Sequence, residues 1–161
     1  MPPTTRVRPR IGDIIEIPTP DGFAYAQFTH RHTDPPKYGS LLRILPGVFK
    51  DRPDDFSRLV AQTPSFSTFF PLGAACHRGI VRVVAEEPIP AHTRDFPTFR
   101  NSHRDPTGKR FPPWFLWDGH REWRAPTLTE DQLRVYPPLG VWNDTMLIQR
   151  IMTGWRHEHD R

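Results

Sequence analysis

Two pairs of histidines are each separated by one residue, a spacing that places both imidazoles on the same side of a β-strand. His30 and His32 form the first pair, and His157 and His159 form the second, beside Glu158. Imidazole nitrogens are common ligands of zinc. Both pairs, however, lie in polar segments, and no cysteine or carboxylate accompanies them at a characteristic zinc spacing. We therefore expect neither a metal site nor another cofactor.

The single cysteine, Cys76, precedes His77, which raises the question of a thiolate nucleophile beside its base. Adjacent residues of a strand point to opposite faces, and a catalytic histidine normally comes from elsewhere in the chain. Because Cys76 follows Ala74 and Ala75, we expect a buried structural thiol instead. A single cysteine also excludes an internal disulfide, which fits a reducing cytoplasm.

Three pairs of adjacent carboxylates could in principle share acid–base work: Asp54-Asp55, Glu86-Glu87 and Glu130-Asp131. Two of them fit the first turns of helices, and the third ends a strand. General acid–base catalysis would also need an apolar cleft, which the sequence does not indicate. The chain contains no P-loop, dinucleotide fingerprint, nucleophile elbow or HExxH motif. We therefore predict that the protein is not an enzyme.

Aromatic residues are unusually dense between positions 96 and 123, with arginines among them. Protein interfaces are enriched in these residue types. An aromatic core with arginine stems packed over it has the same composition, and we favour this interpretation, with some members exposed at a rim. The aromatic members are Phe96, Phe99, Phe111, Trp114, Phe115, Trp117 and Trp123.

The 161-residue chain has a formal net charge of +4, but its basic residues are interleaved with acidic ones. Because the only basic run lies at residues 6–10, we expect no nucleic-acid partner. No apolar run approaches the roughly 20 residues of a membrane span, and no secretory signal begins the chain. We expect a cytoplasmic protein with a single domain over residues 1–161, in which residues 1–9 and 156–161 are flexible.

Residues 11–28 predict a β-hairpin. Two strand-forming runs flank Pro20-Asp21-Gly22, in which Pro20 fixes its own φ, Asp21 tolerates the second turn position and Gly22 takes a left-handed conformation. Small residues on one face, Ala24 and Ala26, suit a strongly curved sheet or a small barrel. Since an isolated hairpin is marginally stable, later strands must complete the sheet.

The remaining segments predict an α+β fold, in which a strongly bent, mostly antiparallel sheet with an SH3-like, barrel-like N-terminal meander packs with two or three short helices. We expect residues 65–77 to form a loop or a short helical turn and residues 101–110 an exposed loop. The expected strands lie within 39–49 and 79–86, and an aromatic hairpin is expected at 113–123 around Asp118-Gly119. Helices are expected at 51–62 and at 144–153, the second capped by Asn143 or Asp144, with one helical turn at 129–133 in which Thr129 and Gln132 form a capping box.

Several segments occur in an order that points to one family. GDIIEIPTPDGFAYAQF at residues 12–28 is followed by GIVRVVAE at 79–86, FPTFRNS at 96–102, WFLWDG at 114–119 and DTMLIQRIMTGW at 144–155. This order resembles immunity protein family 26, small bacterial proteins encoded beside polymorphic toxins. The resemblance covers about residues 10–155. The chain departs from the pattern in VYPPL at 135–139, where a simpler Leu-Pro break is expected, and in a longer proline-rich loop at 33–38.

The resemblance implies binding without catalysis, in which the protein masks the active site of a cognate toxin domain. Because the chain is mildly basic, a nucleic-acid-cleaving toxin is weakly disfavoured as the partner. We predict partner contacts from aromatic, histidine and arginine residues near loops: Tyr25, His30, Arg31, His32, Tyr38, Trp114, Trp117, His120 and Arg121.

Two alternatives stay open. The opening Gly-Asp-Ile-x-x-Ile pattern also resembles, more loosely, the small-barrel ribonucleases of toxin–antitoxin pairs. That function would require a basic groove and a catalytic acid–base pair on the sheet. The second alternative is a stand-alone binding domain without a toxin partner.

Overall fold

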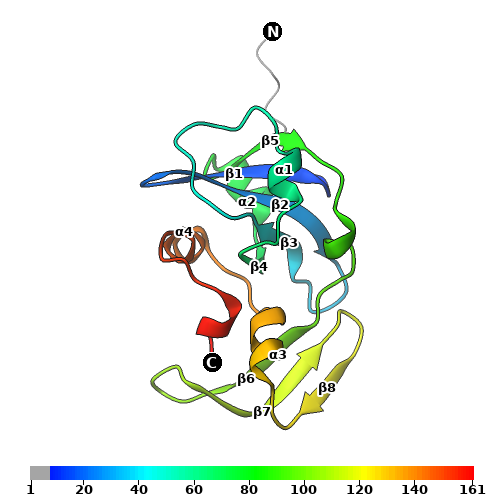
Figure 1. Cartoon of the computed structure of the whole chain (residues 1–161). Helices are drawn as coiled ribbons and strands as arrows, with labels where there is room; N and C mark the ends of the chain where they lie inside the picture. Colours follow the sequence, from blue (N-terminus) through cyan, green and yellow to red (C-terminus); the bar gives the residue numbers. More distant parts are fainter. Residues whose placement is uncertain (1–7) are drawn as a thin grey trace.

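The computed structural model describes residues 8–161 and contains two antiparallel sheets with four short α-helices, α1 to α4 (Figure 1). The first sheet has the strand order β4-β3-β2-β1-β5, and the second has the order β6-β7-β8. The predicted α+β class is therefore confirmed. The first sheet stays open, because its edge strands β4 and β5 do not pair with each other. No helix within residues 8–161 has the length and apolarity needed to cross a membrane.

The predicted N-terminal hairpin is confirmed as β1 (Asp13–Thr19) and β2 (Gly22–His32), paired from Ile14 with Gln27 to Thr19 with Gly22. Gly22 has a φ of 137°, and a Cβ atom at this position would lie 2.3 Å from the carbonyl oxygen of Phe49. Glycine is therefore required here both by the backbone conformation and by the close approach of another segment.

Both faces of the first sheet are covered, which explains the apolar runs in its strands (Figure 1). On one face, residues such as Ile15 and Phe28 pack with Leu147 of helix α4 (Asp144–Met152). On the other face, Ile14 and Tyr25 pack with the segment that contains helix α1 (Ser57–Val60). The sheet is thus the central layer of this part of the protein.

Helix α1 is shorter than the helix predicted at 51–62. The Oδ1 atom of Asp55 accepts a hydrogen bond from the backbone N–H of Ser57 at 2.9 Å, but the N-cap residue is Phe56, which has no side-chain cap. Phe56, Leu59 and Val60 are nevertheless buried together, as their spacing predicts. The apolar stripe was predicted correctly, and the length of the helix was not.

Residues 65–77 contain a strand, β4 (Phe66–Phe70), followed by helix α2 (Leu72–His77). The expectation of a loop or short helical turn was therefore wrong for the first half of the segment. Phe66 and Phe70 enter the main core, while Phe69 enters a second cluster on the opposite face. Because both faces are buried, the sequence lacks the polar alternation by which a strand is recognised. The third and fifth strands, β3 (Gly39–Ile44) and β5 (Arg82–Glu86), lie where predicted.

The second sheet consists of β6 (Phe99–Arg104), β7 (Arg110–Trp117) and β8 (Glu122–Ala125). Its β7–β8 turn contains Asp118-Gly119, as predicted, and Asp118 accepts hydrogen bonds from two backbone N–H groups of the turn. The expected exposed loop at 101–110 is wrong for residues 101–104, which pair with β7, and for Arg110, which begins β7 and is buried. The side chains of residues 101–104 are mostly exposed, so this segment is polar although it is a strand.

The C-terminal helices begin at their predicted caps. Thr129 and Gln132 form a reciprocal capping box at helix α3 (Glu130–Val135), and Asn143 caps α4. Residues 156–161 were expected to be flexible, but they contain the turn η2 (His157–His159) and pack between α3 and the second sheet (Figure 1). A second such turn, η1 (Ala91–Thr93), follows β5. The flexible segment expected at residues 1–9 lies mainly outside the described residues.

Candidate functional site

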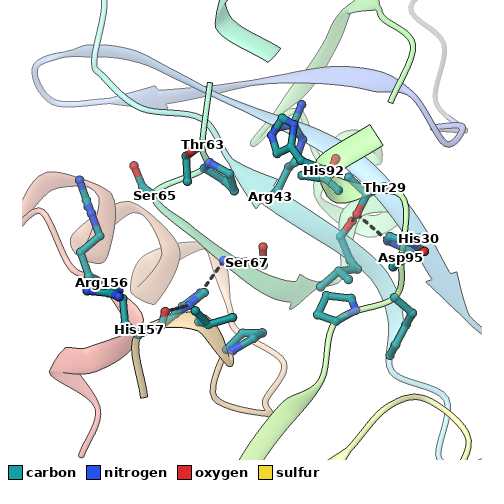
Figure 2. A pocket seen from close by; sticks show the side chains of 18 of the residues that line it. Thr29, His30, Arg43, Thr63, Ser65, Ser67, His92, Asp95, Arg156 and His157 are labelled. Carbon is teal, nitrogen blue, oxygen red and sulfur yellow. Dashed lines mark hydrogen bonds between the residues drawn. The ribbon is translucent and has the colours of Figure 1, made fainter. Parts of the chain in front are cut away.

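A cleft of about 570 Å³ lies between the first sheet, the segment that precedes β6, helix α3 and the C-terminal tail. Its floor comes from β2, β3 and β4 and includes Thr29, Leu41, Arg43 and Ser67. Its walls come from residues 63–65, 92–97, 134–137 and 156–158. Figure 2 shows Thr63 and Ser65 at one side, Arg156 and His157 at another, and Thr29, His30 and Asp95 opposite them. A cavity of this size can receive one or more side chains of a partner.

Arg43 is the most buried charged group of the cleft, with 1% of its surface exposed. Its guanidinium donates to Oε1 of Gln27 from Nε (3.0 Å) and Nη2 (2.7 Å), and to the carbonyl oxygens of Val60 (2.7 Å) and Gln62 (3.4 Å). All four of these bonds go to neutral oxygens. Burial lowers the pKa of Arg43 to about 10, which still leaves it charged at neutral pH. The floor therefore carries a positive charge that these hydrogen bonds hold in place without neutralising it.

His157 connects the tail to both neighbouring elements. Its Nε2 accepts a hydrogen bond from the backbone N–H of Ser67 at 3.0 Å, and its Nδ1 lies 2.9 Å from the carbonyl oxygen of Arg134 (Figure 2). Because a carbonyl only accepts, Nδ1 carries the proton and the imidazole is neutral. Burial lowers the pKa of His157 to about 4, in keeping with that neutral form.

Arg100 holds together the part of the cleft wall that α3 and the C-terminal tail form. Its guanidinium is fully buried and donates to four carbonyl oxygens, those of Leu133, Tyr136, His157 and Asp160. These bonds join β6 to α3 and to the tail. Arginine is suited to this position because its planar group presents five donors in a fixed geometry.

Asp160 adds an ionic contact to the same assembly. Its carboxylate accepts from Nε of Arg110 at 2.8 Å and from Nη2 of Arg104 at 2.8 Å. Burial alone would raise the pKa of Asp160, but the contacts with Arg110 and Arg104 outweigh it and hold the pKa below its usual value. The cleft wall formed by the tail is therefore anchored by an ionised carboxylate.

His30 is the one predicted binding residue that lines the cleft. Its Nε2 lies 2.8 Å from the carbonyl oxygen of Arg94, and its Nδ1 lies 2.9 Å from the hydroxyl of Thr29. These bonds fix the ring between the floor and the wall at 92–97. His30 therefore shapes the cleft, with both ring nitrogens already engaged.

Three further predicted residues, His32, Tyr38 and Trp117, belong to an aromatic cluster that joins the two sheets. The His32 ring packs edge-to-face on Trp117 with a centroid distance of 4.8 Å, and Tyr38 stacks on Phe69 at 5.2 Å. His32 is buried, and its Nδ1 is the one buried side-chain polar atom without a hydrogen-bond partner in the described part of the chain. This cluster confirms that much of the aromatic segment forms core.

The prediction of partner contacts was wrong for Tyr25 and Trp114, because both side chains are buried. Tyr25 lies inside the core, where its hydroxyl donates to Glu16 at 2.9 Å. Trp114 lies beneath the guanidinium groups of Arg100 and Arg110, at 5.1 and 5.8 Å from its ring centroid. Both are aromatic residues that the sequence places near turns, and aromatic residues in such positions often pack inward.

The other three predicted residues are exposed but lie outside the cleft lining. Arg31 contacts the carbonyl oxygen of Pro9 and lies over the ring of Phe28. His120 and Arg121 lie in the β7–β8 turn. The nine predicted positions therefore do not form one surface, and only His30 lies in the cleft.

The metal and nucleophile motifs do not assemble into a reactive group. Within residues 8–161, no three histidine, cysteine, aspartate or glutamate residues lie close enough to hold a metal ion. His159 accepts a hydrogen bond from the backbone N–H of Arg156 instead. Cys76 is half-buried in helix α2, and burial raises the pKa of its thiol to about 11, so the thiol stays protonated at neutral pH.

Arg43, Ser67 and Arg156 line the cleft but were not predicted. One signal for Arg43 was available, since it is a single charged residue inside the apolar run at 41–45. Ser67 and Arg156 gave no such signal, because their roles depend on segments that are distant in sequence. Chemically, the cleft offers a fixed positive charge, hydroxyl groups and an apolar surface. Comparisons of the chain with protein-family models, with curated proteins and with solved structures found no match.

Proposed function

We propose that the protein is a non-catalytic binding protein that neutralises a cognate bacterial toxin domain by covering its active site. The observation that carries this proposal is the preformed cleft. Its walls are held by buried hydrogen bonds and ion pairs of Arg43, Arg100, His157 and Asp160. Because such a surface is already ordered, binding immobilises few further groups and costs little conformational entropy.

The chemistry of the cleft suits a protein partner. Leu41, Phe96 and Pro137 supply apolar surface, while Thr63 and Arg156 supply polar groups near the rim. Protein interfaces commonly combine an apolar centre with polar residues around it. A projecting loop of a toxin domain could enter the cleft while the surrounding surface covers the rest of that domain. The family resemblance of residues 10–155 supports the same partner class.

The ribonuclease alternative requires a basic groove and a catalytic acid–base pair on the sheet. Three histidines line the cleft. His30 on β2 and His157 in the tail each use both ring nitrogens in hydrogen bonds within the protein, and His92 lies in η1, outside the sheet. No feature of the cleft specifically favours this alternative, and it stays a prediction. Incubating the purified protein with RNA and following degradation by electrophoresis tests it; we expect no cleavage above that of a buffer control.

Co-purification tests the proposal itself. The open reading frame immediately upstream would be co-expressed with the tagged protein, and the complex measured by size-exclusion chromatography with light scattering. We expect the two chains to elute together at a fixed stoichiometry. Separate elution of two folded proteins would contradict the proposed function for that neighbour. A tagged variant with the exposed substitution Arg58→Gln serves as a matched control for the surface outside the cleft.

A further inference from the structure

We propose that the cleft recognises a carboxylate side chain, Asp or Glu, presented by the protein partner, and that Arg43 is the counter-charge at its floor. This inference rests on the proposed function, since it names the chemistry that the partner places in the cleft. It assigns a binding role to Arg43, Ser67 and Arg156, which no sequence motif indicated.

Arg43 lines the cleft floor, and its hydrogen bonds to the described residues do not use every donor of its guanidinium. Its Nη1 atom has two hydrogens but makes one long hydrogen bond, at 3.4 Å to the carbonyl oxygen of Gln62. The acceptors around the group are a side-chain amide and two backbone carbonyls, all of them neutral. A buried charge is stabilised most by an opposite charge with hydrogen-bonding geometry, which a carboxylate supplies.

Unlike Arg43, the buried carboxylates Glu16 and Asp160 each contact a side chain of opposite charge. Glu16 accepts two hydrogen bonds from Arg52, and Asp160 is paired with Arg110. Arg100 is buried without a direct carboxylate, but four carbonyl oxygens surround it and Asp160 contributes a favourable charge interaction. Burial is the one cause that lowers the pKa of Arg43, with no carboxylate acting in the opposite direction.

Neighbouring groups complete a carboxylate site. Ser67 is the cross-strand partner of Arg43 in the β3–β4 ladder, and both residues line the cleft, so their side chains leave neighbouring positions of the floor. Arg156 lies on the wall formed by the tail (Figure 2). Its Nη1 donates to the carbonyl oxygens of Gly154 and Trp155. A carboxylate between these groups would meet two positive charges and a hydroxyl donor.

The charges around the cleft favour a single carboxylate over a phosphate or a nucleic acid. Asp95 and Glu158 also line the cleft, and Arg134 is already paired with Asp131. Two fixed carboxylates repel a dianion or a polyanion more than a singly charged side chain. The arrangement therefore discriminates by total charge as well as by shape.

A titration of the ¹⁵N-labelled full chain tests the site without any knowledge of the partner. The probes are the blocked tripeptides acetyl-Gly-Glu-Gly-amide and acetyl-Gly-Gln-Gly-amide, with inorganic phosphate as a third arm. We expect the glutamate peptide alone to give saturable shifts of the Ser67 backbone amide and the Arg43 Nε–H signals. Equal shifts with the glutamine peptide, stronger shifts with phosphate, or no shift with the glutamate peptide would overturn the inference.

Two substitutions of nearly equal size separate charge from shape. Ser67→Asp places a carboxylate next to Arg43 in the protein itself, where it competes with the carboxylate of the ligand. Ser67→Asn adds no charge. We expect the affinity for the glutamate peptide to be about tenfold or more weaker for Ser67→Asp than for Ser67→Asn, and the melting temperature of Ser67→Asp to be the higher of the two. Equal affinities in the two variants would overturn the inference. Arg156→Gln offers a second test at an exposed position, with a loss of affinity expected.

The partner assay keeps the two proposals distinguishable. If the wild-type protein binds its upstream-encoded neighbour and Ser67→Asp binds it as tightly as Ser67→Asn does, the carboxylate inference fails while the proposed function stands. If the wild-type protein does not bind the neighbour, the proposed function fails, and the peptide titration alone decides the carboxylate site. A selective loss of partner affinity in Ser67→Asp supports both.

Discussion

Glu16 and Arg43 lie on the same sheet and are both buried, yet only the carboxylate has a full counter-charge. Burial alone would raise the pKa of Glu16, but hydrogen bonds from Arg52 and Tyr25 outweigh it and hold the pKa below its usual value. Arg43 has only neutral acceptors. The pairing of Glu16 with Arg52 is typical of structural ion pairs, whereas Arg43 keeps a positive charge that a ligand can neutralise.

Arg52→Gln tests the structural role of the first pair. The substitution removes the charged donor from a carboxylate whose side chain is 3% exposed, while the Arg52 side chain itself is 47% exposed. We expect a loss of about 2 kcal/mol in the free energy of unfolding, because Glu16 is left buried without its counter-charge. Urea denaturation measures it. Arg58→Gln, on the exposed side of α1, should change stability by about 0.5 kcal/mol or less; equal effects of the two variants would contradict this role.

The lowered pKa of His157 makes the free energy of unfolding depend on pH. Its pKa is lowered from 6.5 to about 4 in the folded protein, so the unfolded chain binds a proton between these values and the folded chain does not. The stabilising contribution is therefore complete above pH 6.5 and is lost as the pH falls toward 4, with a slope of up to about 1.4 kcal/mol per pH unit. The depressed carboxyl groups Glu16 and Asp160 act at lower pH, since their contribution is lost only below the usual carboxyl range.

Denaturation of wild type and His157→Gln across pH 4.5 to 7.5 isolates this contribution. We expect the wild-type free energy of unfolding to fall below about pH 6.5 and the variant to show a flatter profile over the same range. His120→Gln, which alters an exposed histidine in the β7–β8 turn, should retain the wild-type profile. Parallel profiles for wild type and His157→Gln would show that the imidazole is not held in its neutral form.

At the scale of elements, the C-terminal tail does more than end the chain. It joins α3 to the second sheet through Arg100 and Asp160 and forms one wall of the cleft. The polar composition of residues 156–161 gave no sign of this, because each contact is made with a residue more than twenty positions away. Local propensity cannot report such contacts, and the tail was therefore expected to be flexible.

Asp160→Asn tests the anchoring of the tail. The variant leaves the buried guanidinium of Arg110, with 4% of its side chain exposed, without its counter-charge. We expect a loss of about 3 kcal/mol in the free energy of unfolding. Asp131→Asn removes an exposed i, i+3 ion pair on α3 and should cost less than about 0.5 kcal/mol. A small effect of Asp160→Asn would mean that the tail contributes little to folding.

Gly22→Ala tests the N-terminal hairpin. An alanine Cβ would lie 2.3 Å from the carbonyl oxygen of Phe49, on a residue with a φ of 137°. We expect a loss of more than about 2 kcal/mol, since the backbone of either the turn or the 45–50 segment must move. Gly108→Ala shares the positive φ but meets no atom within 4 Å, and it should cost about 1 kcal/mol. Thermal denaturation compares the two, and similar losses would contradict the steric argument.

Sequence patterns predicted the elements whose signals are local. The Pro-Asp-Gly and Asp-Gly turns, the caps of α3 and α4, and the β-branched strand β5 all lie where expected. Strands β4 and β6 were missed for opposite reasons. Residues 66–70 are mostly buried on both faces, and their order, FSTFF, does not alternate between apolar and polar residues. Residues 101–104 are largely exposed and polar. Neither segment shows the alternation that marks a half-buried strand.

The candidate site was predicted less well than the fold. Of the nine proposed contact residues, His30 lines the cleft, while Tyr25 and Trp114 are core residues. The floor residues Arg43 and Ser67 are adjacent only because β3 pairs with β4, and the wall residue His157 reaches them from the end of the chain. A site assembled from six separate segments has no sequence motif of its own, so it becomes visible only once the segments are packed together.

For the whole molecule, the two sheets meet in the aromatic cluster around Phe69 and Trp117, and the cleft lies beside this junction, since Leu41 and Phe96 belong to both. Stacking of Phe69 on Phe99, with ring centroids 5.0 Å apart, links β4 of the first sheet directly to β6 of the second. The cleft is thus built on packed strands and an anchored tail. Such support favours recognition by a preformed surface, which is the basis of the proposed toxin neutralisation.

Growth of a bacterial host that expresses the upstream open reading frame tests this central claim most directly. Three cultures express the neighbour alone, the neighbour with the wild-type protein, and the neighbour with Ser67→Asp. We predict that the neighbour arrests growth, that the wild-type protein restores it, and that Ser67→Asp restores it less well at equal expression. A toxic neighbour that the wild-type protein fails to neutralise, or growth arrest by this protein itself, would contradict the account.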